Sequence, residues 1–473
     1  MRKTKIVSTL GPASRDPEMI KKLIQAGVNV FRLNFSHGSH EEHLANLNNI
    51  RAVAESLRSP VAILQDLCGP KIRISAVENE YQMIADGDTI ELLSANGSLT
   101  TQKKIFVETL DPVRFLRPGD PILLADGIIS LVAEKNDGQS VTCKIIKGGR
   151  LRSKVGIAFP DSPVDTPATT TKDMDDLTFG IKHGVDFVAI SFVRDASDIR
   201  TVRDKVKELG GDVHLIAKIE RKDAIKNLDE IAEVCDGLMV ARGDLGLEMP
   251  LEQLPRAQRE IIRKGNYLGI PVIVATQMLS SMVTSIRPTR AEVSDVSTAV
   301  MMGADAVMLS EETAIGENPV ECVSYLNAIA LEAEKSFVFE EYKLRMRDAD
   351  HRTVADAIAY AACAAAVKVN AAALIACSTS GYSTRLLAKY RPNQPLFGSS
   401  THTRSLRRMS LFWGVTPVWL SEQSSNHLEE LQHALSTIQR LCDIPKGALA
   451  VITGGLEVNK IGGTSVMEIR EFQ

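Results

Sequence analysis

The stretch HLIAKIE, residues 214–220, is an apolar segment that ends in a lysine and a glutamate. In a β-strand alternate side chains share a face, so Lys218 and Glu220 are predicted to point the same way as Ile216. A second carboxylate, Asp244, stands near the end of the next predicted strand, and adjacent parallel strands lie roughly 5 Å apart. Hard divalent cations favour a site of one or two carboxylates and an anionic substrate. The pattern therefore predicts Mg²⁺ or Mn²⁺ bound by Glu220 and Asp244.

Lys218 is expected to remain charged beside these carboxylates. Its ammonium could then compensate a phosphoryl group during transfer, because catalysis of phosphoryl transfer consists mostly of positioning and charge stabilisation. The alternative is a buried Lys–Glu pair that only holds the strand end, which would be weak evidence for stability. The polar residues that end the other strands favour the catalytic interpretation.

Eight short β-branched runs alternate with helix-period stretches and predict an α/β fold, a (β/α)₈ TIM barrel. The expected strands are residues 5–10, 28–35, 61–67, 186–193, 214–220, 237–245, 271–277 and 306–310. Barrel enzymes place their chemistry at the C-terminal ends of the strands. The polar residues at those ends are Arg32, Asn34, Ser36, Asp66, Ser191, Lys218, Glu220, Asp244, Thr276, Ser310 and Glu311.

Two further domains are expected. Residues 73–166 show alternating runs joined by turns such as the NDG at 136–138, which predicts an all-β domain inserted after the third barrel strand. After a charged linker, alternating helices and strands predict a separate C-terminal α/β domain. The domain prediction is a discontinuous catalytic barrel (1–72 and 167–340), an inserted β-barrel lid (73–166) and a C-terminal α/β regulatory domain (351–473).

Composition excludes several classes of function. The formal net charge of −4 over 473 residues gives no broad attraction to nucleic acid or to an anionic membrane. No apolar run reaches the roughly 18 residues that span a bilayer, and the N-terminus reads as a first strand rather than a signal peptide. The seven cysteines have irregular spacings and predict no disulfide framework. A cytoplasmic enzyme with reduced thiols is expected.

Long motifs in this sequence resemble those of the pyruvate kinase family, in the same order along nearly the whole chain. They are RLNFSHG (32–38), GPKIR (69–73), KIE (218–220), MVARGDLG (239–246), ATQML (275–279), RPTRAE (287–292) and MLSEETAIG (308–316). The resemblance implies transfer of a phosphoryl group from phosphoenolpyruvate to ADP, followed by protonation of the enolate to pyruvate. It also implies Mg²⁺, and by analogy with relatives a homotetramer.

The resemblance assigns roles to individual residues. Lys218 matches the lysine that stabilises the transferred phosphoryl group, and Glu220 and Asp244 match the Mg²⁺ ligands. Arg32 and the Gly243–Asp244 backbone match phosphoenolpyruvate contacts. Thr276 matches the threonine associated with enolate protonation, and Ser310 matches a serine that assists the same proton path. The nucleotide-side matches are Asn34, Ser36, His37 and Arg73.

His37 also begins the run HGSHEEH (37–43), whose three histidines could suggest a metal site. No carboxylate or cysteine set converges with them in the sequence pattern, and we therefore favour a solvated helix start.

One departure from the family pattern concerns a monovalent cation. Many relatives have DTKGPEIR where this chain has DLCGPKIR, so Leu67 replaces a threonine ligand of K⁺ and Lys71 replaces an acidic residue. Asn34, Ser36 and Asp66 remain as a depleted site. Because the Lys71 ammonium can supply the charge that K⁺ would bring, we expect an enzyme that does not require K⁺. Lys154 lies one residue from the position of a nucleotide-binding lysine in relatives and is not assigned a role.

The C-terminal domain contains a candidate effector site. The hydroxyls of STSGYST precede a helix, whose free N–H groups could bind an anion such as a phosphorylated allosteric effector. An ordinary capped helix explains the same residues equally well. The candidate residues are Ser378, Thr379, Ser380, Gly381, Ser383 and Thr384, and the loop 454–464 with Lys460 is predicted to close over them.

Two other functions would suit parts of this pattern. A metal-dependent aldolase or lyase acting on pyruvate enolate would also suit a Glu/Asp metal pair at a barrel mouth, but it would need no lid and no nucleotide-side residues. A non-catalytic sensor of phosphometabolites would not need Lys218 or Thr276. Both residues are present, and they favour the phosphotransferase.

Overall fold

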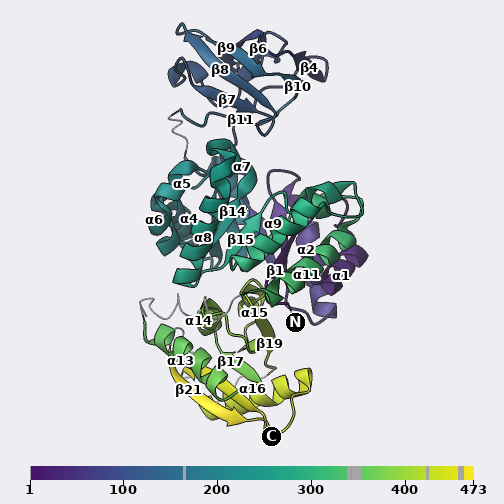
Figure 1. The fold of residues 1–473 in the computed structure, drawn as a ribbon, viewed down its shortest axis with the longest axis vertical. Coiled ribbons are helices and arrows are strands. Elements are labelled where there is room, and N and C mark those ends of the chain that lie inside the picture. Colours follow the sequence, from purple (N-terminus) through teal and green to yellow (C-terminus); the bar gives the residue numbers. More distant parts are fainter. Residues whose placement is uncertain (1, 163–166, 338–341, 343–352, 422–425, 456–462) are drawn as a thin grey trace.

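The computed structural model describes residues 2–162, 167–337, 342, 353–421, 426–455 and 463–473. Three bodies follow one another along its long axis, with the barrel in the middle, the inserted β domain at one end and the C-terminal domain at the other (Figure 1). The predicted linker at 340–352 lies outside the described residues except for residue 342. Most of the loop 454–464, including Lys460, lies outside them too.

Eight parallel strands close into a barrel in the order β1-β16-β15-β14-β13-β12-β3-β2. Each strand is followed by at least one helix, and the predicted fold class is confirmed. The strands are β1 (Lys5–Thr9), β2 (Val30–Asn34), β3 (Ala62–Asp66), β12 (Phe187–Ile190), β13 (His214–Ile219), β14 (Gly237–Ala241), β15 (Val272–Ala275) and β16 (Ala306–Leu309).

Helices surround the barrel. They are α1 (Pro17–Ala26), α2 (His40–Ser56), α3 (Thr171–His183), α4 (Ala196–Glu208), α5 (Lys222–Lys226), α6 (Leu228–Val234), α7 (Arg242–Glu248), α8 (Leu254–Leu268), α9 (Arg290–Met301), α10 (Glu311–Ala314) and α11 (Pro319–Lys335), with 3₁₀ turns η2 (Leu251–Gln253) and η3 (Ser280–Val283). Of the helices among the described residues, none is long and apolar enough to cross a membrane.

One strand prediction is wrong at its C-terminal end. Residues 237–245 were expected to form one strand, but β14 ends at Ala241 and α7 begins at Arg242. Asp244 therefore lies in the first turn of a helix, where a carboxylate is favourable beside the positive end of the helix dipole. The Asp244 side chain still projects from the mouth of the barrel.

The alternation predicted for β13 is confirmed. Ile216 belongs to the cluster that fills the barrel interior, together with Leu64 of β3 and Ile273 of β15. Leu215 and Ile219 belong to the larger cluster between the strands and the outer helices. Lys218 therefore shares the inward face with Ile216, at the C-terminal end of the barrel.

The inserted domain follows β3. It consists of a six-stranded sheet in the order β11-β7-β8-β9-β5-β6 and a two-stranded sheet of β10 and β4. A turn at 136–138 joins β8 to β9 as the sequence predicts, and Gly138 there has φ of +84°. The elements are β4 (Tyr81–Ile84), β5 (Thr89–Ser94), β6 (Lys104–Val107), η1 (Pro112–Arg114), β7 (Pro121–Leu124), β8 (Ile129–Asn136), β9 (Val141–Lys147), β10 (Gly149–Arg152) and β11 (Ile157–Ala158).

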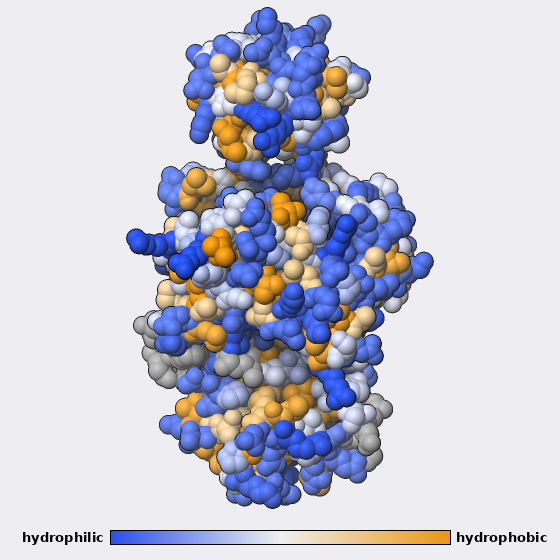
Figure 2. Space-filling model, turned by 90° about the vertical axis from the view of Figure 1, so that its right-hand side faces the viewer, coloured by the Kyte–Doolittle hydropathy of each residue, from blue (hydrophilic) through white to orange (hydrophobic). Residues whose placement is uncertain are grey.

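The outgoing and returning segments of this domain run side by side. Ile157 N–H donates to the Ile72 carbonyl at 3.1 Å, and Ile74 N–H donates to the Val155 carbonyl at 3.1 Å. The space-filling view shows a narrow waist between this domain and the barrel (Figure 2). We call residues 73–162 the lid.

The C-terminal domain is a five-stranded sheet in the order β19-β18-β17-β20-β21, with β21 antiparallel to β20. Helices and strands alternate along this domain, as the sequence predicts. The elements are α13 (Val354–Lys368), β17 (Ala373–Cys377), α14 (Tyr382–Lys389), β18 (Leu396–Ser400), α15 (Thr403–Met409), β19 (Val415–Trp419), α16 (His427–Cys442), β20 (Leu449–Gly455) and β21 (Thr464–Glu471).

The segment between α15 and β19 closes the N-terminal end of the barrel. Leu411 is completely buried and belongs to the cluster inside the barrel. Lys5 Nζ of β1 donates to the Val415 carbonyl at 2.6 Å, and Gly414 N–H donates to the Lys3 carbonyl at 2.8 Å. The C-terminal domain thus contributes to the barrel core at the end opposite the candidate site.

We expect Leu411→Ala to lower the free energy of unfolding by about 2–5 kcal/mol, because it leaves a cavity in the barrel floor. Urea unfolding followed by tryptophan fluorescence measures this, since Trp413 is buried at the same interface. Leu441→Ala is the matched control, because Leu441 is 67% exposed on α16. Equal unfolding midpoints for the two variants would contradict a role for Leu411 in the barrel core.

Candidate active site

Three barrel strands, β2, β3 and β13, bring a row of charges together at the mouth of the barrel. Lys218 Nζ lies 3.1 Å from Asp66 Oδ1 and 2.9 Å from Glu220 Oε1. Arg32 Nε donates to the other Asp66 oxygen at 2.7 Å. The Asp66 and Glu220 side chains are each only 1% exposed, whereas Lys218 and Arg32 are 11% and 12% exposed. The two cations, Lys218 and Arg32, are therefore more exposed at the barrel mouth than the buried carboxylates that pair with them.

The environment shifts the pKa of each central group. Burial opposes the charged form of Lys218, but the charges of Asp66 and Glu220 outweigh it and raise the pKa of the ammonium well above its ordinary value. Burial likewise opposes ionisation of Asp66, yet Lys218 and Arg32 hold its pKa below the ordinary value. For Glu220, burial raises the pKa in spite of Lys218, and the charge of Asp244 raises it further.

Ser191 holds Lys218 from the neighbouring strand end. Its hydroxyl accepts a hydrogen bond from Lys218 Nζ at 2.7 Å and donates to the Leu67 carbonyl at 2.7 Å. Ser191 appears among the polar strand ends in the sequence, but no role was assigned to it. Ser191 can link Lys218 to the segment that leads to the lid because β12 pairs with β3 in the barrel, and the sequence does not show this pairing.

Thr276, after β15, adopts a left-handed backbone with φ of +68°, which is strained for a β-branched residue. Its hydroxyl donates to the Ala275 carbonyl at 2.6 Å and accepts from Gly243 N–H at 2.8 Å. The Gly243 N–H, predicted to contact substrate, thus has an internal partner here. Arg242, which sequence reasoning missed, donates to the Thr276 carbonyl at 2.6 Å and pairs with Asp295 at 2.6 Å.

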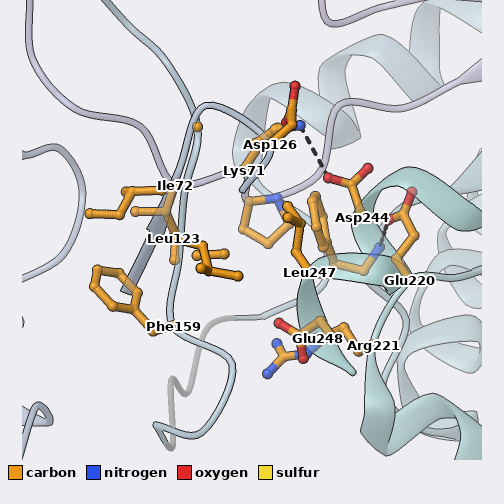
Figure 3. A pocket seen from close by; sticks show the side chains of 15 residues that line it. Lys71, Ile72, Leu123, Asp126, Phe159, Glu220, Arg221, Asp244, Leu247 and Glu248 are labelled. Atoms are coloured by element: carbon orange, nitrogen blue, oxygen red, sulfur yellow. Dashed lines mark hydrogen bonds and ion pairs between the residues drawn. The ribbon is translucent and has the colours of Figure 1, made fainter. Parts of the chain in front are cut away.

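A cleft of about 700 Å³, open to solvent, lies between the lid and the mouth of the barrel. Glu220 and Asp244 both line it from the barrel side, and Lys71 Nζ reaches Asp244 Oδ1 at 3.1 Å (Figure 3). Ile72, Leu123 and Phe159 face the same space from the lid side; the remaining lining residues are Pro70, Asp126, Gly156, Ile157, Ala158, Phe192, Arg221, Leu247 and Glu248.

The two carboxylates fit a hard divalent cation. Both present carboxylate oxygens to one cleft. Burial raises the pKa of Glu220 and the charge of Asp244 raises it further, so a cation between the two carboxylates would stabilise their charged forms. Glu220 Oε2 also accepts from Phe192 N–H at 2.8 Å, which fixes the orientation of its carboxylate.

The nucleotide-side residues do not all converge. Asn34 ends β2 and Ser36 lies in the turn that follows, where Ser36 N–H donates to Asn34 Oδ1 at 3.2 Å. His37 is exposed beside them. Arg73 instead lies at the base of the lid, where its guanidinium donates to the Lys154 carbonyl at 2.9 Å. The structure therefore places Arg73 on the lid and the other three on the barrel.

The interpretation of residues 37–43 as a solvated helix start is wrong for His43. This side chain is only 7% exposed and stacks on Phe35, with ring centroids 3.9 Å apart. His40 is partly exposed and pairs with Asp176 at 2.7 Å. His43 is buried because it stands four residues before Leu47 and seven before Ile50, on the same buried face of α2.

Residues expected to form a depleted cation site have internal contacts in this structure. Leu67 is 2% exposed and packs in the core between strands and helices, while Asp66 is paired with Arg32 and Lys218. Lys71 pairs with Asp244 rather than with Asp66.

In the C-terminal domain, several candidate effector residues have internal partners. The Ser378 hydroxyl accepts from Gly381 N–H at 3.0 Å, and the Ser380 hydroxyl accepts from Tyr382 N–H at 3.4 Å. Thr379 uses its carbonyl to accept from Ser405. Ser383 and Thr384 are buried, and the Ser383 hydroxyl bonds to that of Thr464.

A closed parallel barrel with two cations and two carboxylates at its C-terminal mouth, facing a lid, defines a (β/α)₈-barrel enzyme with a site for an anionic ligand. The family model for the pyruvate kinase barrel domain matches residues 1–323, and that for the pyruvate kinase alpha/beta domain matches residues 356–470. The chain belongs to the pyruvate kinase family and is a phosphotransferase.

Curated relatives match over almost the whole chain. A pyruvate kinase of Staphylococcus epidermidis is 41% identical over 474 residues, which cover 99% of this chain and 80% of the relative. A pyruvate kinase of Geobacillus stearothermophilus is 41% identical over 472 residues with the same coverage. Pyruvate kinase 2 of Synechocystis is 40% identical over 477 residues, covering 99% of this chain and 79% of the relative.

We expect Asp66→Asn to lower the pKa of Lys218, because Asp66 is the partner that raises it most. On the alkaline side of the pH profile, kcat/KM should therefore begin to fall at a lower pH in Asp66→Asn than in the wild type, because the reaction needs the charged ammonium. The measurement is kcat/KM against pH, with Asp204→Asn on the exposed face of α4 as the matched control. An unchanged alkaline limb in Asp66→Asn would show that Asp66 does not maintain the charge on Lys218.

Proposed function

We propose that this enzyme transfers the phosphoryl group of phosphoenolpyruvate to ADP, giving pyruvate and ATP. In this reaction the bond between phosphorus and the enol oxygen breaks, a bond between phosphorus and a β-phosphate oxygen of ADP forms, and the enolate takes up a proton. The observation that supports the proposal most is the Lys218 ammonium fixed between Asp66 and Glu220 at the barrel mouth. Family membership supports the same substrates.

Lys218 and Arg32 are proposed to stabilise the phosphoryl group while it moves. Both cations are anchored to Asp66 by contacts of 3.1 and 2.7 Å, so neither has to reorganise when negative charge develops. Arg32 is further fixed by donating to the Thr9 hydroxyl at 3.1 Å.

Glu220 and Asp244 are proposed to hold Mg²⁺ or Mn²⁺. When bound, this ion would neutralise charge on the phosphoryl and carboxylate oxygens of the substrate. The chain prepares the site by orienting Glu220 through Phe192 N–H and by placing Asp244 in the first turn of α7.

Thr276 is proposed to orient the groups that protonate the enolate. Its hydroxyl stands between the Ala275 carbonyl and Gly243 N–H, and Arg242 fixes the strained backbone beside it. Ser310, which follows β16, would assist the same proton path by resemblance to the family. Its N–H donates to the buried Glu312 carboxylate at 2.6 Å, which fixes its backbone.

The lid is proposed to close over the cleft and exclude water during transfer. Asn34, Ser36 and His37 would contact the nucleotide from the barrel, and Arg73 would contact it from the base of the lid. The assignment of a homotetramer, a cytoplasmic location and a phosphorylated effector near residues 378–384 follows from resemblance to the family and remains part of this proposal.

We further propose that the enzyme does not require K⁺. The Leu67 side chain has no oxygen atom to offer a cation and packs in the core. Lys71 places an ammonium 3.1 Å from Asp244 at the edge of the cleft. The Lys71 ammonium, fixed at the edge of the cleft, would supply the positive charge that a monovalent cation brings in relatives.

Lys218→Met should lower kcat by about a hundredfold to a thousandfold or more, because it removes a preorganised charge from the transition state. Turnover is measured with ADP, phosphoenolpyruvate and Mg²⁺ in an assay coupled to lactate dehydrogenase. Lys207→Met is the matched control, since Lys207 is 70% exposed on α4. Wild-type turnover in the Lys218 variant, or none in the wild type, would refute the proposed function.

Rates of the wild type at saturating Mg²⁺ should be equal in potassium and in tetramethylammonium buffer. Lys71→Met should be slower than the wild type in tetramethylammonium, because the fixed ammonium is lost. The same coupled assay measures both, with Lys207→Met again as the control. A large loss of wild-type rate when potassium is withdrawn would refute independence from K⁺.

A further inference from the structure

His43 is a buried polar residue that the proposed chemistry does not use. It lies in the first turns of α2, and its ring is 7% exposed. Its Nε2 atom stands 2.9 Å from the His37 carbonyl oxygen. Because a carbonyl oxygen only accepts hydrogen bonds, Nε2 must be the protonated nitrogen.

The same ring contacts the other end of the turn after β2. It stacks on Phe35 with ring centroids 3.9 Å apart and an interplanar angle of 11°. Among the described residues, the Nδ1 atom of His43 has no hydrogen-bond partner. The bond to the His37 carbonyl is therefore the specific polar contact of this side chain within the described protein.

The turn lies directly against the start of α2. His37 N–H donates to the Asn34 carbonyl at 3.3 Å, which closes the turn. Gly38 has φ of +80°, and a Cβ atom there would approach Glu42 Oε2 to 3.1 Å and His43 Nε2 to 3.4 Å. A larger residue at this position would be strained and would crowd the hydrogen bond from His43.

A second side chain, from another helix, also holds the turn. Lys172, in the first turn of α3, donates from Nζ to the Phe35 carbonyl at 2.9 Å and pairs with Asp176 at 2.6 Å. The carbonyls of Phe35 and His37 are thus fixed by two helices, whereas the Lys172 side chain is 59% exposed and the His43 ring is buried. His43 therefore holds the His37 end of the turn, and Lys172 holds the Phe35 end.

We propose that His43 is a positioning residue for the nucleotide. It holds the turn of Asn34, Ser36 and His37 in the conformation that receives ADP, by donating to the His37 carbonyl and stacking on Phe35. This inference rests on the proposed function, which places ADP on that turn. The barrel mouth around Lys218 is held by other contacts, so the site for phosphoenolpyruvate should not depend on His43.

The test compares His43→Leu, which keeps apolar bulk but removes the N–H, with His43→Gln, which keeps a side-chain N–H donor. A net hydrogen bond of about 0.5–1.5 kcal/mol corresponds to a change of roughly twofold to tenfold. His43→Leu should therefore raise the KM for ADP by that factor, with the KM for phosphoenolpyruvate unchanged. His43→Gln should restore the KM for ADP most of the way to wild type.

Leu47→Ala is the matched control, because Leu47 is buried on the same helix and is an apolar packing residue. It should lower thermal stability and leave the KM for ADP unchanged. An equal rise in both KM values in His43→Leu, or a rise in Leu47→Ala as large as in His43→Leu, would overturn the inference in favour of a purely structural role. If His43→Leu folds poorly, the test depends on His43→Gln. A KM for ADP in His43→Gln as high as that in Asn34→Ala would then overturn the inference.

Asn34→Ala separates this inference from its premise. If Asn34→Ala raises the KM for ADP and His43→Leu does not, the positioning role fails while the proposed nucleotide site stands. If neither Asn34→Ala nor Ser36→Ala changes the KM for ADP, the proposed nucleotide site itself is wrong, and the role of His43 is overturned with it.

Discussion

The active site depends on one interaction, the contact of the Lys218 ammonium with two buried carboxylates. Taking an ammonium out of water is costly unless its partners are close and well oriented. Asp66 and Glu220 lie 3.1 and 2.9 Å away, and Ser191 adds a hydrogen bond at 2.7 Å. A group fixed in this way supplies positive charge without moving, which is what a transition state with migrating charge requires.

The strand order of the barrel makes the contact of Lys218 with Asp66 possible. The residues of this cluster come from or directly follow four consecutive strands of the closed sheet, β2, β3, β12 and β13. They are Arg32, Asp66, Ser191 and Lys218. In the chain, the lid separates β2 and β3 from β12 and β13. The interior below them is filled by apolar side chains, and Leu411 of the C-terminal domain completes that core. Charges are thereby confined to one end of the barrel, beside the lid cleft.

Much of this arrangement could be predicted from the sequence. Strand periodicity gives the barrel, and the alternation along HLIAKIE places Lys218 on the inward face. Other features depend on contacts between segments that are distant in the chain. The pairing of Lys71 with Asp244, the internal partner of the Gly243 N–H and the place of Arg73 on the lid all require the relative positions of lid and barrel.

Two errors have local physical causes. The strand predicted to contain Asp244 ends earlier because ARGDLG starts a helix, and a sequence of mixed polarity does not show that boundary. The burial of His43 is not evident from the sequence because two glutamates precede it, whereas in the fold its ring stacks on Phe35 from the preceding turn. Helical spacing from Leu47 is the signal that could have identified it.

The central claim can be tested by measuring the ionisation of Lys218 directly. The ¹⁵N chemical shift of Lys218 Nζ can be followed against pH in selectively labelled protein, with the resonance assigned by its absence in Lys218→Met. We predict that Lys218 stays protonated well above the ordinary lysine value of 10.5, up to the highest pH at which the protein is folded. Titration at or below that ordinary value would contradict the account, because it would mean that Asp66 and Glu220 do not hold the charge in place.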